Sequence, residues 1–439
     1  MKHRVTGKRI NWPILYPHVI GMLRLFYREF KIKGKEKIPK NHPLILTPNH
    51  QNAFMDALIM IKVFGAWRQI SYLVRASIFG TKIGDFFFYR FNMMPVYREV
   101  DGKENLGKNE EIFENCIYIL ENKRILLLFP EGTHHIKKQK LPLKKGFTRI
   151  ALSAEERNNF NLDIVIIPVG LYFNRLSDYG GRVLINIGDP IYLKDYKEIY
   201  KENPNKVHNL IKSKLDPILS DLMIDIKNSH FYECINFCRE IDLNEKGIKK
   251  IESDFIHSKS LIQKLDLLIS SNEEKAIELK SLTERYKAVL KKNDLRDILF
   301  SKTYQQPSIL EKLFFLLITP IGFYGWINNY LPFIIPRNIA NKKIKDEGFR
   351  SSIKLAAAMF LFPVFHLLQT TIMIFILPEW WMVGAYWASL PITFFIGVWW
   401  KRKIKRFTSL GRLNSIRETS EVKNAMDNRR EIVIILNSL

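Results

Sequence analysis

Between residues 42 and 195, short apolar runs of the kind that form strands alternate with segments able to form helices. This alternation predicts an α/β domain, which we place at residues 31–195. The expected strands are residues 44–47, 70–74, 94–96, 124–129, 164–169 and 183–187.

A different pattern begins after this domain. Residues 196–305 are rich in Lys, Glu and Leu, and their apolar residues recur every three or four positions, as on one face of a helix. Ser271 with Glu274 reads as a capping box at the start of one helix. The region therefore predicts a helical hairpin or small bundle that has no catalytic role.

Two long apolar stretches follow, residues 353–377 and 381–400, each close to the roughly 20 residues that span a hydrocarbon core. A short turn joins them, and basic residues flank both outer ends. By the positive-inside rule, residues 353–400 are predicted to form a transmembrane hairpin and residues 401–439 a basic cytoplasmic tail. His366, inside the first stretch, has no acidic partner in the sequence nearby and is interpreted as a packing residue.

Two further segments have membrane character. Residues 313–335 are apolar but interrupted by Asn328-Asn329 and by prolines, and a single crossing would contradict the charge argument. We therefore predict a re-entrant or interfacial segment at residues 306–336. Residues 12–30 suit a helix at the membrane surface, which we assign to residues 1–30, although packing against the α/β domain is an alternative.

Composition narrows the range of partners. The chain has 68 Lys and Arg against 44 Asp and Glu, a formal charge of +24, which favours nucleic acid, an anionic lipid surface or a phosphorylated substrate. The aromatic residues gather in the membrane segments instead of interleaving with a basic groove, which disfavours nucleic acid. The three cysteines offer no even disulfide framework and no visible metal site, so we expect packing cysteines in a reducing compartment. No signal peptide is readable, which predicts a cytoplasmic N-terminus.

Candidate chemistry starts in the sequence PNHQNAFMDAL, residues 48–58. A histidine can act as a base near neutral pH, and a carboxylate bonded to its other ring nitrogen holds the tautomer, as His50 and Asp56 would require. Six residues of regular helix would put these two side chains on different faces. We therefore expect His50 in a loop, Asp56 in the first turns of a helix, and Asn49 or Asn52 as the cap of that helix.

A second cluster carries groups that suit an anion. The sequence LLLFPEGTHH, residues 126–135, ends a strand in a turn where Gly132 lets backbone amides approach an anionic group closely. Thr133 and Lys144 are expected to complete that contact. Arg98, just beyond the strand in MMPVYREVDG, offers a planar fork that suits phosphate.

Together these motifs resemble the glycerol-phosphate/lysophosphatidate acyltransferase family, whose four sequence blocks occur here in order. They are NHQNAFMD at residues 49–56, MMPVYR at 93–98, FPEGT at 129–133 and IVIIPVG at 164–170. The resemblance covers about residues 30–195. It implies a mixed sheet flanked by helices, to which the helical insert and the C-terminal membrane helices are added.

The chain departs from the family pattern in two places. Five residues instead of four separate the histidine from the aspartate, which resembles the fungal-type branch that acylates glycerol-3-phosphate and dihydroxyacetone phosphate. That branch also carries helical and membrane-spanning sequence after its catalytic domain. His134 stands where arginine is common, so Lys137 or Lys138 is expected to supply that phosphate contact, with His134 and His135 in a solvated turn.

The resemblance implies a membrane-bound O-acyltransferase of phospholipid biosynthesis. His50 would take the proton from a glycerol hydroxyl, Asp56 would orient His50, and the hydroxyl would attack an acyl thioester. Acyl-CoA or acyl carrier protein is expected as the acyl donor, and neither a cofactor nor a metal is expected. The catalytic domain of this integral membrane protein would lie on the cytoplasmic face.

The acceptor site rests on the same resemblance. Arg98 and the Glu131-Gly132-Thr133 turn would hold a phosphate-bearing acceptor. Because its charge repels phosphate, Glu131 is expected to face acceptor hydroxyls or to position Arg98. The acceptor stays open between glycerol-3-phosphate, dihydroxyacetone phosphate, 1-acylglycerol-3-phosphate and an amino-lipid, and so does the oligomeric state. A non-catalytic lipid-binding membrane protein is the alternative outside this class.

Overall fold

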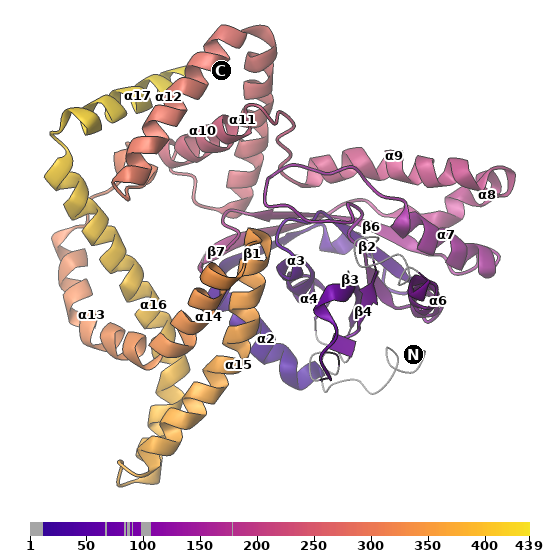
Figure 1. The fold of residues 1–439 in the computed structure, drawn as a ribbon, viewed down its shortest axis with the longest axis horizontal. Helices are drawn as coiled ribbons and strands as arrows, with labels where there is room; N and C mark the ends of the chain where they lie inside the picture. The colour runs from indigo at the N-terminus through magenta and orange to yellow at the C-terminus, as the bar shows by residue number, and fades with distance from the viewer. Residues whose placement is uncertain are drawn as a thin grey trace. The chain divides into compact units, whose positions relative to one another are not determined.

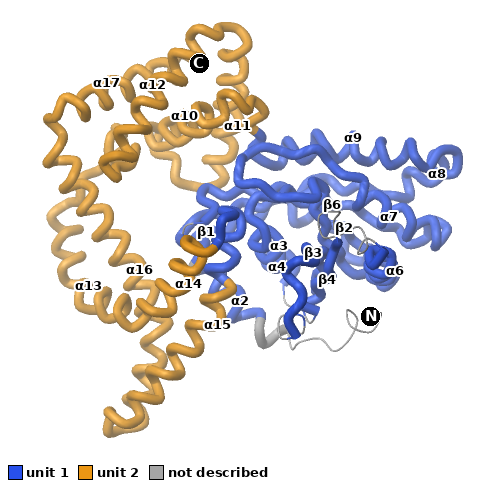
Figure 2. The backbone as a smooth tube through the Cα atoms, viewed as in Figure 1, with its two compact units in different colours: residues 1–225, 344–355 blue, residues 226–343, 356–439 orange. Residues whose placement is uncertain are grey.

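The computed structural model describes residues 12–65, 68–82, 85, 88–89, 91–97, 107–177 and 179–439. The chain forms two compact units (Figure 2). The first unit comprises residues 1–225 and 344–355, and the second comprises residues 226–343 and 356–439.

One mixed sheet forms the centre of the first unit (Figure 1). Its strands follow the order β1-β7-β6-β2-β5-β3-β4, and β8 pairs with β6 beside this path. All pairs are parallel except those of β6 with β7 and with β8. The strands are β1 (Tyr27–Lys33), β2 (Leu44–Pro48), β3 (Ile70–Arg75), β4 (Met93–Val96), β5 (Ile125–Leu127), β6 (Val165–Phe173), β7 (Gly181–Ile187) and β8 (Ile191–Tyr192). The expected α/β fold with a mixed sheet flanked by helices is confirmed.

Helices pack on this sheet through one apolar face each. The buried residues of α6, α7 and α9 join the apolar side chains of β2, β5 and β6 in one core. Both faces of β2, β5 and β6 are covered, which is why these strands read as nearly continuous apolar runs. The helices of the unit are α2 (Trp12–Phe26), α3 (Phe54–Ile59), α4 (Ile61–Phe64), α6 (Lys108–Glu121), α7 (Gly146–Arg157), α8 (Lys197–Glu202) and α9 (Pro204–Leu222).

The end of α9 lies directly on the sheet. The side-chain amide of Asn186 donates to the carbonyl of Leu222 at 2.9 Å, and a Cβ added to Gly170 would lie 2.0 Å from the same oxygen. The predicted domain boundary at residue 195 therefore cuts through the first unit, which continues to residue 225.

The N-terminal segment differs from its prediction. The helix expected over residues 12–30 ends at Phe26, and strand β1 begins at Tyr27. The sequence of β1, YREFKIK, carries charges because this strand lies at the edge of the sheet, so it lacks the apolar run of a central strand. Leu23 and Phe26 are buried, and the Phe26 ring contacts Tyr179, which favours the packing alternative for this helix.

The second unit contains a helical bundle built from α10 (Tyr232–Glu245), α11 (Ile251–Ser271), α12 (Glu273–Lys292) and α17 (Ser420–Asn437). The cap of α12 is Asn272, whose side chain accepts from the amide of Lys275 at 3.0 Å. The expected capping box of Ser271 with Glu274 is wrong, because Ser271 still belongs to α11 and its hydroxyl bonds the carbonyl of Leu267.

The C-terminal segment is part of this bundle. Helix α17 packs against α12, and the buried guanidinium of Arg429 bonds Asp297 at 2.8 Å and Glu245 at 2.9 Å. Residues 401–439, predicted as a basic tail, thus contain the end of α16 and a helix that completes a folded core.

Three helices, α13 (Ile309–Asn328), α15 (Glu347–Ile374) and α16 (Trp380–Ile416), are long and apolar enough to cross a membrane. Helices α15 and α16 contain most of the two stretches predicted to form a transmembrane hairpin, and α15 ends three residues before the first stretch does. Many apolar side chains of the three helices are exposed, such as Leu367 of α15 at 63% and Leu317 of α13 at 73%, which suits contact with lipid.

The interrupted segment forms two helices, α13 and α14 (Tyr330–Lys343). Helix α13 runs antiparallel to α16, and its last residues reach the level of Tyr386, whose hydroxyl donates to the side-chain oxygen of Asn328 at 3.0 Å. His366 of α15 bonds the side chain of Asn329 at 2.8 Å. Helix α14 then starts back, with the Phe333 ring against Phe394. Such a turn part-way along α16 suits a re-entrant segment, and its placement in a membrane stays a prediction.

Candidate functional site

The loop after β2 places His50 at the carboxyl end of the central parallel strands. β2 lies between β5 and β6, and all three end at this edge. Asn49 extends the pairing by one residue, because its side chain both donates to the carbonyl of Leu171 and accepts from the amide of Leu171, at 3.2 and 2.6 Å. Carboxyl ends of parallel strands are the usual location of ligand sites in open α/β sheets.

His50 and Asp56 meet across a tight turn. Nδ1 of His50 lies 2.9 Å from Oδ2 of Asp56, and the same oxygen accepts from the amides of Gln51 at 2.8 Å and Asn52 at 2.7 Å. Asp56 is fully buried in the first turn of α3. The arrangement matches the expected loop and helix positions of the two residues.

The turn between them depends on an unusual backbone conformation. Ala53, the residue before α3, has φ +42° and ψ −126°, a region that residues with a Cβ rarely adopt. The N-cap residue of α3 is Ala53, so the expectation that Asn49 or Asn52 caps this helix is wrong. Asn49 bonds β6, and the Asn52 amide donates to Tyr27 and to the carbonyl of Leu176.

Two rings pack against the imidazole of His50. The Phe129 ring stacks on it with centroids 3.5 Å apart and planes 11° apart, and the His134 ring meets it at 5.2 Å and 66°. With Nδ1 donating to Asp56, the lone pair of the ring is on Nε2, which is the arrangement of a general base. Its side chain is 13% exposed, so the imidazole is sheltered but reachable.

Glu131 braces the loop instead of pointing at solvent. Its two carboxylate oxygens accept from the backbone amides of His50 at 3.3 Å and Leu141 at 3.2 Å. Burial raises the pKa of the Glu131 carboxyl to about 8, although both amide bonds and the nearby charge of Asp56 also act on it. Glu131 thereby joins the His50 loop to the segment around residue 141, and its contact with acceptor hydroxyls or with Arg98 stays a prediction.

The turn after Glu131 brings three of the predicted residues together. Gly132 has φ +72°, a conformation that favours glycine, and Lys144 donates its amide to the carbonyl of Pro130 at 2.7 Å. A Cβ at Gly132 would lie 3.2 Å from Cγ of Lys144, so the lysine stem runs along this turn. Gly132, Thr133 and Lys144 are all exposed. Arg98 lies outside the described residues.

Residues 29–172 match the acyltransferase family model. These residues form an acyltransferase domain. The match begins in β1 and ends in β6, so it includes His50, Asp56 and the turn at residues 131–133.

Relatives of the acyltransferase domain are found in yeasts. Glycerol-3-phosphate O-acyltransferase 2 of Saccharomyces cerevisiae is 25% identical over an alignment of 302 residues that covers 61% of this chain and 38% of that protein. Glycerol-3-phosphate O-acyltransferase 1 of the same yeast is 26% identical over 117 residues, 26% of this chain and 15% of that protein. An uncharacterized acyltransferase of Schizosaccharomyces pombe is 22% identical over an alignment of 435 residues that covers 76% of this chain and 62% of that protein. The chain thus spans less than two thirds of the length of each relative.

The sequence did not indicate that residues 344–355 belong to the first unit, which contains the acyltransferase domain. Nε2 of His134 lies 2.9 Å from Oδ2 of Asp346, and the hydroxyl of Ser351 donates to the side-chain oxygen of Asn52. The expected solvated turn at His134 is therefore wrong, since its side chain is only 15% exposed. No sequence motif signals these contacts, because the partners lie some 200 to 300 positions apart along the chain.

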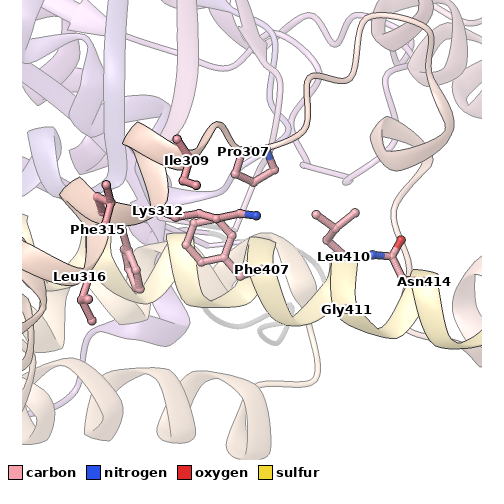
Figure 3. Close-up of a pocket in the computed structure, with 10 residues that line it drawn as sticks. Pro307, Ile309, Lys312, Phe315, Leu316, Phe407, Leu410, Gly411 and Asn414 are labelled. Carbon is pink, nitrogen blue, oxygen red and sulfur yellow. The ribbon is translucent and has the colours of Figure 1, made fainter.

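The second unit contains a groove of its own. A groove of about 490 Å³ opens in the second unit between the start of α13 and the second half of α16 (Figure 3). Its lining is apolar apart from Lys312 and Asn414, and it contains none of the predicted site residues. Among the residues that the structure describes, no three His, Cys, Asp or Glu side chains lie close enough to hold a metal ion.

Proposed function

We propose that this protein is a membrane-bound acyltransferase that moves a fatty acyl group from an acyl thioester to a hydroxyl of a glycerol-phosphate acceptor. The observation that carries the proposal is the His50–Asp56 pair, a base held by a buried carboxylate at the sheet edge of an acyltransferase domain. His50 and Asp56 are the proposed catalytic residues.

In the proposed reaction, Nε2 of His50 takes the proton of the acceptor hydroxyl while its oxygen attacks the thioester carbonyl. The carbon–sulfur bond breaks, an ester bond forms, and the proton passes from His50 to the departing thiolate. Asp56 stabilises the imidazolium that exists between these two transfers. Backbone or side-chain donors beside His50 stabilise the negative charge that develops on the thioester oxygen. This reaction uses neither a metal nor a bound cofactor.

The acceptor site is assigned to the turn at residues 131–133 with Lys144 and Arg98. The turn lies next to the His50 loop, because the Glu131 carboxylate accepts from the backbone amide of His50. The side chain of Lys144 runs along Gly132. A cation beside an exposed glycine turn suits a phosphate group. The two Saccharomyces cerevisiae relatives are named for glycerol-3-phosphate, which favours this acceptor over 1-acylglycerol-3-phosphate and amino-lipids.

The membrane helices suit a lipid product. The exposed apolar side chains of α13, α15 and α16 favour insertion in a bilayer, and the basic residues after Trp400 favour a cytoplasmic catalytic domain. A net charge of +24 suits the polyanionic acyl-CoA, an acidic acyl carrier protein and anionic lipid headgroups alike.

The test is an assay of the purified full-length protein in detergent micelles with one labelled acyl-CoA and one acceptor at a time. The acceptors are glycerol-3-phosphate, dihydroxyacetone phosphate, 1-acylglycerol-3-phosphate and a sphingoid base, and acyl carrier protein thioester replaces acyl-CoA in a second series. We expect transfer to glycerol-3-phosphate. Transfer to 1-acylglycerol-3-phosphate alone would overturn that preference, and no transfer to any acceptor would favour a non-catalytic lipid-binding protein.

A further inference from the structure

The first turns of α15 approach the candidate active site from a distant part of the sequence. Residues 344–355 belong to the first unit, and their contacts with that unit include the His134 loop and the His50–Asp56 segment, besides a bond from Lys354 to the carbonyl of Ser177. The same helix continues without a break to Ile374, through the apolar stretch that begins at residue 353.

The two carboxylate oxygens of Asp346 have different partners, the first turn of α15 and the ring of His134. Oδ1 accepts from the amide of Gly348 at 2.9 Å, which caps the start of α15, and Oδ2 lies 2.9 Å from Nε2 of His134. Gly348 leaves room for this contact, because a Cβ there would lie 2.8 Å from Cδ2 of His134. The Phe349 ring meets the His134 ring edge to face at 4.9 Å.

His134 in turn limits where the imidazole of His50 can lie. That imidazole is bonded to Asp56 through Nδ1, stacked on Phe129, and in edge contact with His134. Rotation of His134 away from Asp346 would remove the third of these restraints. The chain of contacts therefore runs from the start of α15 through one imidazole to the other.

A second set of contacts reaches the loop between His50 and Asp56. The hydroxyl of Ser351 donates to the side-chain oxygen of Asn52, whose backbone amide donates to Asp56 at 2.7 Å. Ser352 accepts from the amide of Met55 at 3.1 Å. Ser351 and Ser352 are buried, so these bonds are made away from water.

We infer that residues 346–352 are a positioning element of the active site, in which Asp346 acts on His50 through His134 and Ser351 acts on Asp56 through Asn52. The inference rests on the proposed function, because it assumes that His50 is the base. None of these residues needs to touch substrate. The proposed catalytic residues are thus positioned by the start of α15, a helix that is long and apolar enough to cross a membrane.

Substitutions at Asp346 separate positioning from capping. Asp346→Ser and Asp346→Asn both cap a helix well, but the serine hydroxyl is too short to cap Gly348 and reach His134 together. Glu347→Gln is the matched control, because it removes one charge from the next residue, which pairs with Arg350 on the surface.

For the full-length protein in micelles, we expect Asp346→Ser to lower kcat about tenfold with the KM for the acyl donor within about twofold, since a misplaced base slows chemistry and not donor binding. Asp346→Asn should recover most of kcat, and Glu347→Gln should match the unaltered protein. A purely capping role predicts full kcat in both Asp346 variants, and that result overturns the inference.

A measurement independent of activity separates this inference from the proposed function. Diethyl pyrocarbonate modifies imidazole nitrogens, and mass spectrometry reports its rate at each histidine. We expect His134 to react several times faster in Asp346→Ser than in the unaltered protein, with His42 unchanged as the internal control. Equal rates at His134 overturn the inference. A faster rate at His134 in a protein that transfers no acyl group to any acceptor keeps the contact and overturns the proposed function instead.

Discussion

One oxygen of Asp56 bonds three donors at once, the ring of His50 and the backbone amides of Gln51 and Asn52. The Asp56 carboxylate therefore both fixes the loop at residues 51–52 and orients the imidazole of His50. Its other oxygen is buried and has no hydrogen-bond partner among the described residues, so it leaves an unused acceptor close to His50.

This pair leads to the first prediction. We expect His50→Ala to lower kcat about 10²- to 10⁴-fold, because the hydroxyl then loses its base. Asp56→Asn should lose a similar factor, because an amide favours the wrong tautomer of His50. The control is His42→Ala, which removes a second histidine that contacts an aspartate, Asp163, and should stay within twofold. Acyl transfer at saturating substrates is the measurement, and full activity in His50→Ala would remove the histidine from the mechanism.

The second prediction concerns the pH dependence of stability through Glu131. Its pKa is raised from 4.5 in the unfolded chain to about 8 by burial, so the folded state holds a proton that the unfolded state has lost between these values. Glu131 thus adds stability at low pH that is lost as the pH rises from about 4.5 to 8. We expect the melting temperature to fall less between pH 5.5 and 8 in Glu131→Gln than in the unaltered protein. An identical fall in both would show that the carboxyl ionises freely.

Backbone strain at Ala53 gives the third prediction. Glycine adopts φ +42° with ψ −126° easily and alanine does not, so Ala53→Gly should stabilise the fold by about 1 kcal/mol, roughly 2–4 °C in melting temperature. Ala57→Gly is the matched control within α3, and it should lower the melting temperature, because glycine weakens a regular helix. Scanning calorimetry in micelles compares the two. A lower melting temperature for Ala53→Gly would show that the turn is unstrained.

Lys144 provides the fourth prediction. Lys144→Gln should raise the KM for a phosphorylated acceptor several-fold with little change in kcat, because a cation beside the Gly132 turn is lost. Lys145→Gln removes the same charge from the adjacent exposed position at the start of α7. Steady-state kinetics with varied acceptor would separate the two variants. Equal effects would indicate a diffuse attraction by positive charge instead of a defined contact.

The fifth prediction tests the role of the C-terminal helix. Arg429→Met should destabilise the bundle of the second unit by about 3–5 kcal/mol, because it removes the buried cation that bonds both Asp297 and Glu245. Arg430→Met, one residue away and exposed in a surface pair with Asp427, should have little effect. Thermal unfolding followed by circular dichroism compares them. If both variants melted with the unaltered protein, the C-terminal helix would be dispensable.

Local patterns predicted much of the first unit. The apolar runs of β2, β5 and β6 are readable because both faces of these strands are buried. The approach of His50 to Asp56 was predicted because a loop that contains His50 leads directly into a helix whose first turn contains Asp56. Strand β1 was missed because an edge strand tolerates charge. Strand β1 pairs with β7, which lies some 150 residues later in the sequence, so no neighbouring strand pattern indicates it.

The rest depends on contacts that no local pattern encodes. Asp346 and Ser351 look like ordinary residues before an apolar helix, and only the fold brings them to His134 and Asn52. The C-terminal segment was read as a tail because its charges dominate, although every third or fourth residue of α17 is buried. Asn272 replaces Ser271 as the cap of α12 because the preceding helix runs one residue further than its pattern suggests.

The split composition of the first unit has a practical consequence. A fragment that stops at residue 225 contains the whole sheet but leaves Asn52 and the amide of Met55 without the serine hydroxyls that bond them. Removing the apolar helices to obtain a water-soluble protein would therefore leave these polar groups without hydrogen-bond partners from the protein, close to the imidazole of His50. Any shortened version has to carry residues 344–355 along, grafted by a linker to the end of α9.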